Sequence, residues 1–163
     1  MRVAMLFVAA ALALAACGKP AAEAPMANTN DPTWLEKNAV LPGWITIAQG
    51  SDGSQVTYDP KSITRDQAAG TADVWVQVRH KYPLTYKWED GAAAHELTYV
   101  VQRRLFRFRC EARQVANVET RYMRDENVAA QTFETPPKTE ADWRAIDPTG
   151  IAAKLEGPAC RST

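Results

Sequence analysis

The amino-acid sequence predicts an α+β fold, in which an antiparallel β-sheet of about six strands, a meander, is followed by a C-terminal helix tied to it by a disulfide. Three observations predict this fold. Short runs with strand-like alternation follow one another with tight turns between them, which favours antiparallel pairing of neighbours. After Pro136-Pro137 the spacing of apolar residues becomes helical. One cysteine, Cys110, ends the longest run, and another, Cys160, follows the helical segment.

The first two strands form a predicted hairpin. Residues 43–49 alternate in polarity, residues 55–58 form a second run, and turn-forming residues occupy positions 50–53 between them. A third strand, Val74–Tyr82, follows a turn at Gly70 and is rich in β-branched and aromatic residues.

The longest predicted strand is Glu96–Cys110. Because successive side chains of a strand point to opposite faces, Phe106, Phe108 and Cys110 share one face, which we expect to contact the core. The remaining predicted strands are Val115–Met123 and Ala129–Thr135.

The C-terminal region reads as helical. Glu140–Ile146 is predicted to form a short helical turn that carries Trp143. Thr149–Leu155 is predicted to form a helix, which Gly157-Pro158 would stop.

The N-terminus has the layout of a signal peptide. A positive start, Met1-Arg2, precedes an apolar run that ends at Cys17 and is shorter than the ~20 residues that span a membrane. The last residues of the run, Leu14-Ala15-Ala16-Cys17, resemble the lipobox of bacterial lipoproteins. That resemblance implies cleavage after residue 16 and attachment of acyl chains such as palmitate to Cys17, which would anchor the protein in a membrane. The alternative is an ordinary secreted protein whose signal happens to contain a cysteine.

Three regions follow from this layout: a lipoprotein signal peptide at 1–16, the lipidated Cys17 with a flexible tether at 17–33, and a single domain at 34–163. The tether has no hydrophobic period and is rich in Ala, Pro, Asn and Thr. Gly18, rather than Asp, follows Cys17, and in lipoproteins this favours sorting to the outer membrane.

Lipidation of Cys17 would leave Cys110 and Cys160 as the remaining cysteines. In an oxidising compartment we expect these two to form a structural disulfide. The alternative, a redox or metal site, lacks a C-x-x-C motif and a histidine near either cysteine in the sequence.

Charge excludes some classes of function and points to one surface. The chain of 163 residues has 19 basic and 19 acidic side chains, which argues against a general nucleic-acid binder. The even balance of charge does not hold in residues 103–124, which contain seven arginines and only two glutamates. Arg103, Arg107 and Arg109 share one strand face, so this surface is either a patch for an anionic polymer, such as lipopolysaccharide phosphates or sulfated glycans, or a solvated face neutralised by acids from neighbouring strands.

Aromatic side chains form a second candidate surface. Tyr82 directly precedes Pro83, and Tyr86 and Trp88 lie between Pro83 and Gly91, so we predict that all three belong to a loop. In this loop they would either bind a ligand or fold back over the sheet edge. The serines and the two histidines lie in no nucleophile or metal motif, and there is no glycine-rich phosphate loop. We therefore expect no catalytic residues, no metal, no other cofactor and no enzymatic activity.

Several residue groups, in order, resemble the surface-adhesin protein E family of bacterial lipoproteins over roughly residues 43–160. The groups are Trp44, Tyr58-Asp59, Ser62-Ile63 with Arg65, Val74-Trp75-Val76, Phe108-Arg109-Cys110, Tyr122, Trp143-Arg144-Ala145-Ile146 with Pro148, and Cys160. The resemblance implies a six-stranded antiparallel sheet with a disulfide-tied helix, binding of host matrix or serum proteins, and possible homodimers. The region 82–95, which is rich in alanine, departs from the family pattern.

Two functions follow as hypotheses. The first is an outer-membrane-anchored lipoprotein, facing the periplasm or the cell surface, that acts as an adhesin-like binding module for proteins. The second is a structural envelope lipoprotein whose arginine-rich sheet face docks to lipopolysaccharide or to an envelope partner.

Overall fold

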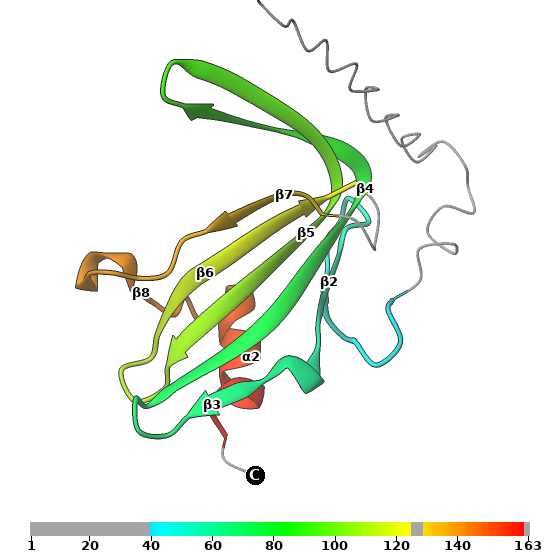
Figure 1. The fold of residues 1–163 in the computed structure, drawn as a ribbon. Helices are drawn as coiled ribbons and strands as arrows, with labels where there is room; N and C mark the ends of the chain where they lie inside the picture. Colours follow the sequence, from blue (N-terminus) through cyan, green and yellow to red (C-terminus); the bar gives the residue numbers. More distant parts are fainter. Residues whose placement is uncertain (1–39, 125–128, 162–163) are drawn as a thin grey trace, which may run out of the picture.

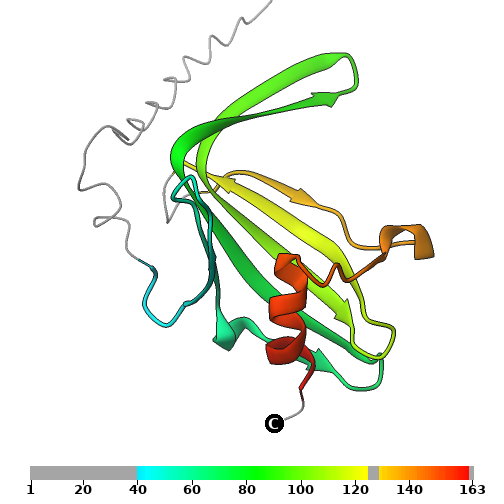
Figure 2. The same cartoon turned by 180° about the vertical axis from the view of Figure 1, so that it is seen from behind.

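The computed structural model describes residues 40–124 and 129–161. Within these residues the chain forms one antiparallel sheet with a helix packed on one of its faces, as Figures 1 and 2 show from opposite sides. The strands along the sheet are, in spatial order, β1 (Ile45–Gln49), β2 (Gln55–Tyr58), β4 (Thr71–Asp90), β5 (Ala93–Arg109), β6 (Gln114–Met123) and β7 (Ala129–Glu134). The predicted fold class is therefore confirmed.

Two short strands extend this path at its margins. β3 (Thr64–Asp66) pairs with the beginning of β4, and β8 (Arg144–Ala145) pairs with the beginning of β6. Two 3-10 turns, η1 (Pro60–Ser62) and η2 (Glu140–Asp142), precede β3 and β8 respectively. The predicted helical turn over residues 140–146 is thus a 3-10 turn followed by a strand.

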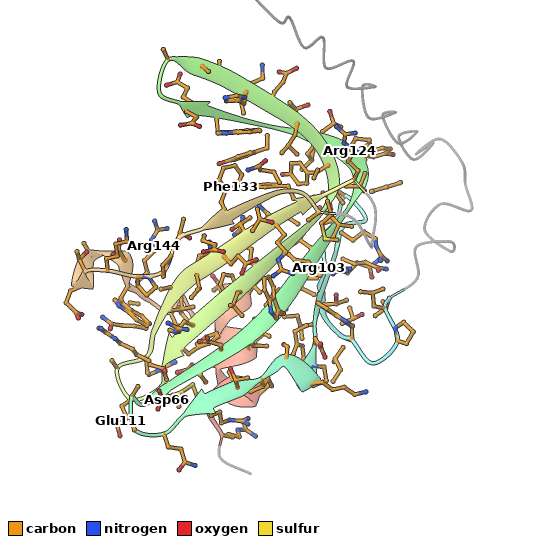
Figure 3. The ribbon with its side chains drawn as sticks, in the orientation of Figure 1. Asp66, Arg103, Glu111, Arg124, Phe133 and Arg144 are labelled. Atoms are coloured by element: carbon orange, nitrogen blue, oxygen red, sulfur yellow. A yellow bond between two sulfur atoms is a disulfide. The ribbon has the colours of Figure 1, made fainter. Side chains whose placement is uncertain are left out.

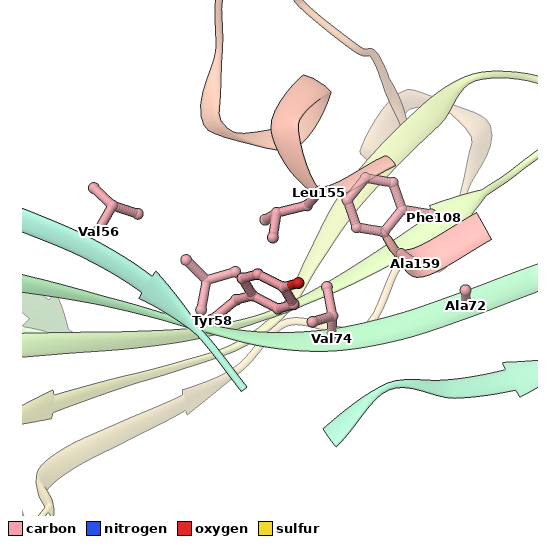
Figure 4. Packing of buried hydrophobic residues seen from close by; sticks show 8 residues of the cluster. Val56, Tyr58, Ala72, Val74, Phe108, Leu155 and Ala159 are labelled. Carbon is pink, nitrogen blue, oxygen red and sulfur yellow. The ribbon is translucent and has the colours of Figure 1, made fainter. Parts of the chain in front are cut away.

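The helix α2 (Ile151–Cys160) covers the sheet face on which Phe108 lies. Phe108, Val74 and Leu155 are fully buried in this core, and Phe106 and Cys110 pack against it, as the strand alternation predicts (Figure 4). The disulfide between Cys110 and Cys160 joins the end of β5 to the end of α2. The covalent link and the apolar contacts therefore act at the same junction.

The sequence-based end of this helix is wrong, because α2 continues through Gly157-Pro158 to Cys160. Arg65 supplies hydrogen bonds to carbonyl groups of the last turn. Its Nε donates to the Ala159 carbonyl and its Nη2 donates to the Pro158 carbonyl, both at 2.8 Å. A cation at a helix C-terminus also complements the helix dipole. Together with the buried Ala159 and the disulfide, these contacts hold the last turn in place.

The strands β4 and β5 continue beyond the main sheet as a long bent hairpin (Figure 1). Their register shifts where residues 80–83 of β4 face only Val100 of β5, and Pro83, which has no N–H to donate, lies in this bulge. Residues 84–99 beyond the bulge are here called the arm. Gly91, with φ +62°, makes the tight turn at its tip.

Candidate functional site

A cleft of about 640 Å³ opens on the sheet face opposite α2, where β3, β4 and β5 lie side by side. Two rows of paired residues form its floor. One row is Thr64, Asp73 and Arg107, and the other is Asp66, Thr71 and Arg109. Residues directly opposite each other on neighbouring strands point to the same face, so strand register alone brings these six side chains together. Figure 3 shows Asp66 at this end of the sheet.

One wall of the cleft is residues 137–143, here called the η2 segment. Asp142 shapes the segment, because its carboxylate accepts hydrogen bonds from the backbone N–H groups of Lys138 and Thr139, both at 2.8 Å. These hydrogen bonds lower the pKa of Asp142. The pairing of β8 with β6 then holds the segment beside the sheet.

The Arg107–Asp73 pair lies on the floor of the cleft. The Arg107 guanidinium donates to both Asp73 carboxylate oxygens, at 2.8 and 2.7 Å. The hydrogen bonds to Asp73 raise the pKa of Arg107. A two-bond pair of this kind fixes both side chains in orientation.

Arg109 connects the floor to the η2 segment. Its guanidinium donates to both oxygens of Glu140, at 2.5 and 2.9 Å, and lies 4.1 Å from the centre of the Trp143 ring. The hydrogen bonds raise the pKa of Arg109 and lower that of Glu140. Arg109 therefore makes both a two-bond ion pair and a cation–π contact.

These features suit recognition better than proton transfer. Every shifted carboxylate of the cleft and of its wall has a lowered pKa, so it is ionised at neutral pH and does not serve as a proton donor. Among residues 40–124 and 129–161, no three His, Cys, Asp or Glu side chains come together as metal ligands. The cleft instead offers paired charges, threonine hydroxyls and one indole ring.

Of the three predicted arginines, Arg107 and Arg109 line the cleft, whereas Arg103 lies further along the same strand (Figure 3). The Arg103 Nε donates to Gln77 at 2.7 Å, and its guanidinium lies 5.5 Å from the Trp44 ring. All three arginines therefore lie on the same sheet face, but only Arg107 and Arg109 line the cleft.

Carboxylates neutralise much of the arginine-rich segment. Arg107, Arg109, Arg113 and Arg121 pair with Asp73, Glu140, Glu156 and Glu119 in that order. The first three carboxylates lie outside residues 103–124, so the segment's excess of positive charge is far smaller in space than along the chain.

The predicted loop around Tyr82, Tyr86 and Trp88 is wrong, because all three residues lie in β4. Tyr86 stacks on Tyr122 of β6, with ring centres 4.3 Å apart, and the Trp88 ring contacts Phe133 of β7 edge-to-face at 5.5 Å. β4 does not pair with β6 or β7, so these ring contacts hold the arm against the main sheet, which explains why strand structure continues past Pro83. Figure 3 shows Phe133 beneath the arm.

Tyr82 and Trp88 differ in exposure, because Tyr82 is exposed and Trp88 is half-buried. Tyr82 lies in the bulge and is 54% exposed, with the Lys81 ammonium 5.3 Å from its ring centre. Trp88 also stacks on His95 of β5 at 5.1 Å, beside a shallow hollow of about 580 Å³ near the arm tip. Tyr86 and Trp88 thus fold back onto the sheet, as one of the two sequence-based alternatives proposed, and Tyr82 does not.

Apart from Arg107 and Arg109, sequence reasoning missed the members of the cleft, among them Asp66, Asp73, Glu140 and Trp143. One signal was available for Asp73: if β4 and β5 form a hairpin, an acid on β4 lies opposite an arginine on β5. The η2 segment carried no such signal, because its position depends on β8, a strand of two residues.

Fold and cleft together define a class: a small disulfide-linked β-sheet protein with a polar cleft on the sheet face opposite its helix. The model of the family described as surface-adhesin protein E matches residues 44–161. The chain belongs to this family, which makes it an adhesin-like protein of the cell surface. The predicted resemblance is confirmed.

Solved structures of Haemophilus influenzae protein E share the fold. The selenomethionine form has 15% sequence identity and a TM-score of 0.50, and covers 76% of this chain and 89% of that one. Crystal form II has 15% identity and a TM-score of 0.50, and covers 76% of this chain and 91% of that one. A third structure has 14% identity and a TM-score of 0.51, and covers 77% of this chain and 92% of that one. No curated protein sequence matches the chain significantly. In the part of the chain that the structure describes, no helix has the length and apolar character needed to cross a membrane.

Proposed function

We propose that this protein is an outer-membrane-anchored lipoprotein that binds proteins, such as host matrix or serum proteins, through the cleft opposite α2. The lipobox-like sequence at Cys17, which lies outside the described residues, supports the anchor. Family membership supports the adhesin role. The single observation that carries the choice of surface is the convergence of Arg107, Arg109 and Trp143 in one open hollow.

The chemistry of the cleft favours a protein ligand. Arginine and tryptophan are enriched among the residues that contribute most to protein–protein binding. The lining also balances acidic Asp66, Asp73 and Glu140 against basic Arg107, Arg109 and Lys138. A balanced polar surface can pair with the mixed charges of a protein, whereas it offers a polyanion little net attraction.

The alternative function, docking to lipopolysaccharide through the arginine-rich face, receives less support. Docking along this face would require the Arg107–Asp73 and Arg109–Glu140 pairs to open together, and the nearby carboxylates Asp66 and Asp73 would repel a run of phosphate groups. Opening a two-bond pair costs free energy that the new contact must exceed.

The test uses full-length protein, purified in detergent, and a panel of immobilised matrix and serum proteins. Ala69→Glu places a long acidic side chain over the cleft at an exposed position, so we expect it to weaken binding about tenfold or more. Ala112→Glu adds the same charge at an exposed turn outside the cleft, and we expect it to bind as wild type does.

Four outcomes would contradict the proposal. Wild-type protein that binds nothing on the panel would refute the protein-binding function. Equal weakening by both variants would show a charge effect, and equal retention would exclude the cleft. Binding only to vesicles that contain lipopolysaccharide would favour the alternative function.

A further inference from the structure

The two ion pairs of the cleft differ in how firmly their carboxylates are held. Asp73 lies in the middle of the sheet, directly opposite Arg107, and its side chain is 18% exposed. Glu140 lies on η2 and its side chain is 77% exposed. The strand ladder fixes the first carboxylate, whereas water or a ligand can reach the second.

Arg109 keeps other contacts that do not depend on Glu140. Trp143 lies against its guanidinium at 4.1 Å, and Gln114 accepts a longer hydrogen bond from its Nη1 at 3.4 Å. Stacking on an aromatic ring leaves the N–H edge of an arginine available in the plane of the guanidinium. Departure of the Glu140 carboxylate would therefore leave an oriented two-bond donor at the mouth of the cleft.

The surroundings select which anion can take that place. Asp66 and Asp73 line the same cleft and would repel a densely charged polyanion. A single carboxylate on a polypeptide brings one charge, together with backbone groups that can pair with the hydroxyls of Thr64, Thr71 and Thr139. An acidic protein segment fits this arrangement best.

We propose that Glu140 occupies the position of a ligand carboxylate, and that the cleft binds an acidic side chain of a partner protein, which replaces Glu140 on the Arg109 fork. This inference rests on the proposed protein-binding function and names the chemical class of its ligand. Glu140 acts as an intramolecular competitor. The apparent dissociation constant of the ligand is therefore its intrinsic value divided by the fraction of molecules in which Glu140 does not occupy Arg109.

The test measures binding of a fluorescent peptide that carries one Glu among Gly and Ser residues, blocked at both ends, to full-length protein in detergent. Glu140→Gln removes the competing charge; if Glu140 occupies Arg109 in about nine-tenths of the molecules, the substitution is expected to tighten binding about tenfold. Glu134→Gln makes the same charge change at an exposed position of β7 and is expected to leave the affinity unchanged. The same peptide with Lys in place of its Glu is expected to gain nothing from Glu140→Gln.

Arg109 variants complete the test. Arg109→Gln combined with Glu140→Gln is expected to abolish the gain, and Arg109→Lys, which keeps the charge but loses the fork, is expected to retain only part of it. Unchanged or weaker peptide binding by Glu140→Gln, or an equal gain in Glu134→Gln, would overturn the inference. If matrix proteins still bound in that case, the proposed function would stand; if they failed to bind while the peptide behaved as expected, only the proposed function would fall.

Discussion

His80 shows how one side chain can couple stability to pH. It lies in the bulge at the base of the arm, and its ring contacts Tyr99 edge-to-face at 5.6 Å. Within the described residues, its buried Nε2 has no hydrogen-bond partner. Burial lowers the pKa of His80, the Asp52 charge opposes this shift, and the Arg104 charge adds to it. The folded protein therefore favours a neutral imidazole.

The expected consequence is a loss of stability in mild acid. Because the pKa of His80 is lower in the folded protein than in the unfolded chain, the unfolded chain binds the proton first, and stability falls as the pH drops below about 6.5 towards the folded pKa. His80→Phe removes this titration, so its free energy of unfolding should change less between pH 7 and pH 5. Urea denaturation at several pH values measures this slope.

His95→Phe, at an exposed position of the arm, is the matched control and should keep the wild-type slope. A His80→Phe protein that loses as much stability over this pH range as wild type would contradict the assignment.

Only some of the individual site residues could be predicted from the sequence. The alternation of β5 placed Arg103, Arg107 and Arg109 on one face, because alternation depends on neighbours along the chain. Asp73, the partner of Arg107, lies 34 positions away and could be inferred only from a β4–β5 hairpin register, whereas Glu140, the partner of Arg109, lies 31 positions away on a segment that the fold alone places. The ligand roles of Tyr82, Tyr86 and Trp88 stay predictions.

At the scale of elements, prediction succeeded where local pattern and tertiary contacts agree. The strands of the main sheet follow from alternation and turn residues. Prediction failed at Pro83 and at Gly157-Pro158, which are strong local breakers. At both places contacts distant in sequence prevail: the aromatic rings of β6 and β7 support the arm, and Arg65 of β3 supports the end of α2.

The attachment of α2 to β5 can be tested directly. Cys110→Ala combined with Cys160→Ala should lower the free energy of unfolding by about 4 kcal/mol, because the unfolded chain regains the conformations that closure of a 50-residue loop excludes. Chemical denaturation of the variant and of wild type measures the difference.

Reductant provides the control for this prediction. It should destabilise wild type to the level of the double variant and leave the variant unchanged. Equal stability of wild type and variant without reductant would show that packing alone secures the helix.

At the scale of the molecule, β4 and β5 carry two distinct surfaces. The cleft lies where β4 begins and β5 ends, and the arm lies at the opposite end of the same strands (Figure 1). Substitutions in one surface therefore have no direct contact with the other, and their effects should add. Each surface can be tested without altering the other.

The proposed lipid anchor at Cys17 concerns the whole molecule as well. Cys17→Ser should abolish incorporation of labelled palmitate and move the protein from the membrane fraction to the soluble fraction, because each buried methylene of an acyl chain contributes about 0.8 kcal/mol to membrane binding. Metabolic labelling and fractionation of cells measure both effects.

The Cys110→Ala and Cys160→Ala double variant is the control here, and it should incorporate label as wild type does. Continued labelling of Cys17→Ser would place the lipid elsewhere, and a wild-type protein without label would exclude lipidation.

The disulfide has one more consequence, which concerns proteolysis. Cys110 and Cys160 enclose β6, β7, η2, β8 and nearly all of α2 in a single covalent ring. A protease that cuts once within this ring, for example at the exposed residues 111–113, leaves both fragments joined through sulfur. A nicked molecule outside the cell would therefore retain every strand of its sheet, and shedding of a fragment from the ring would require a second cut or a reductant.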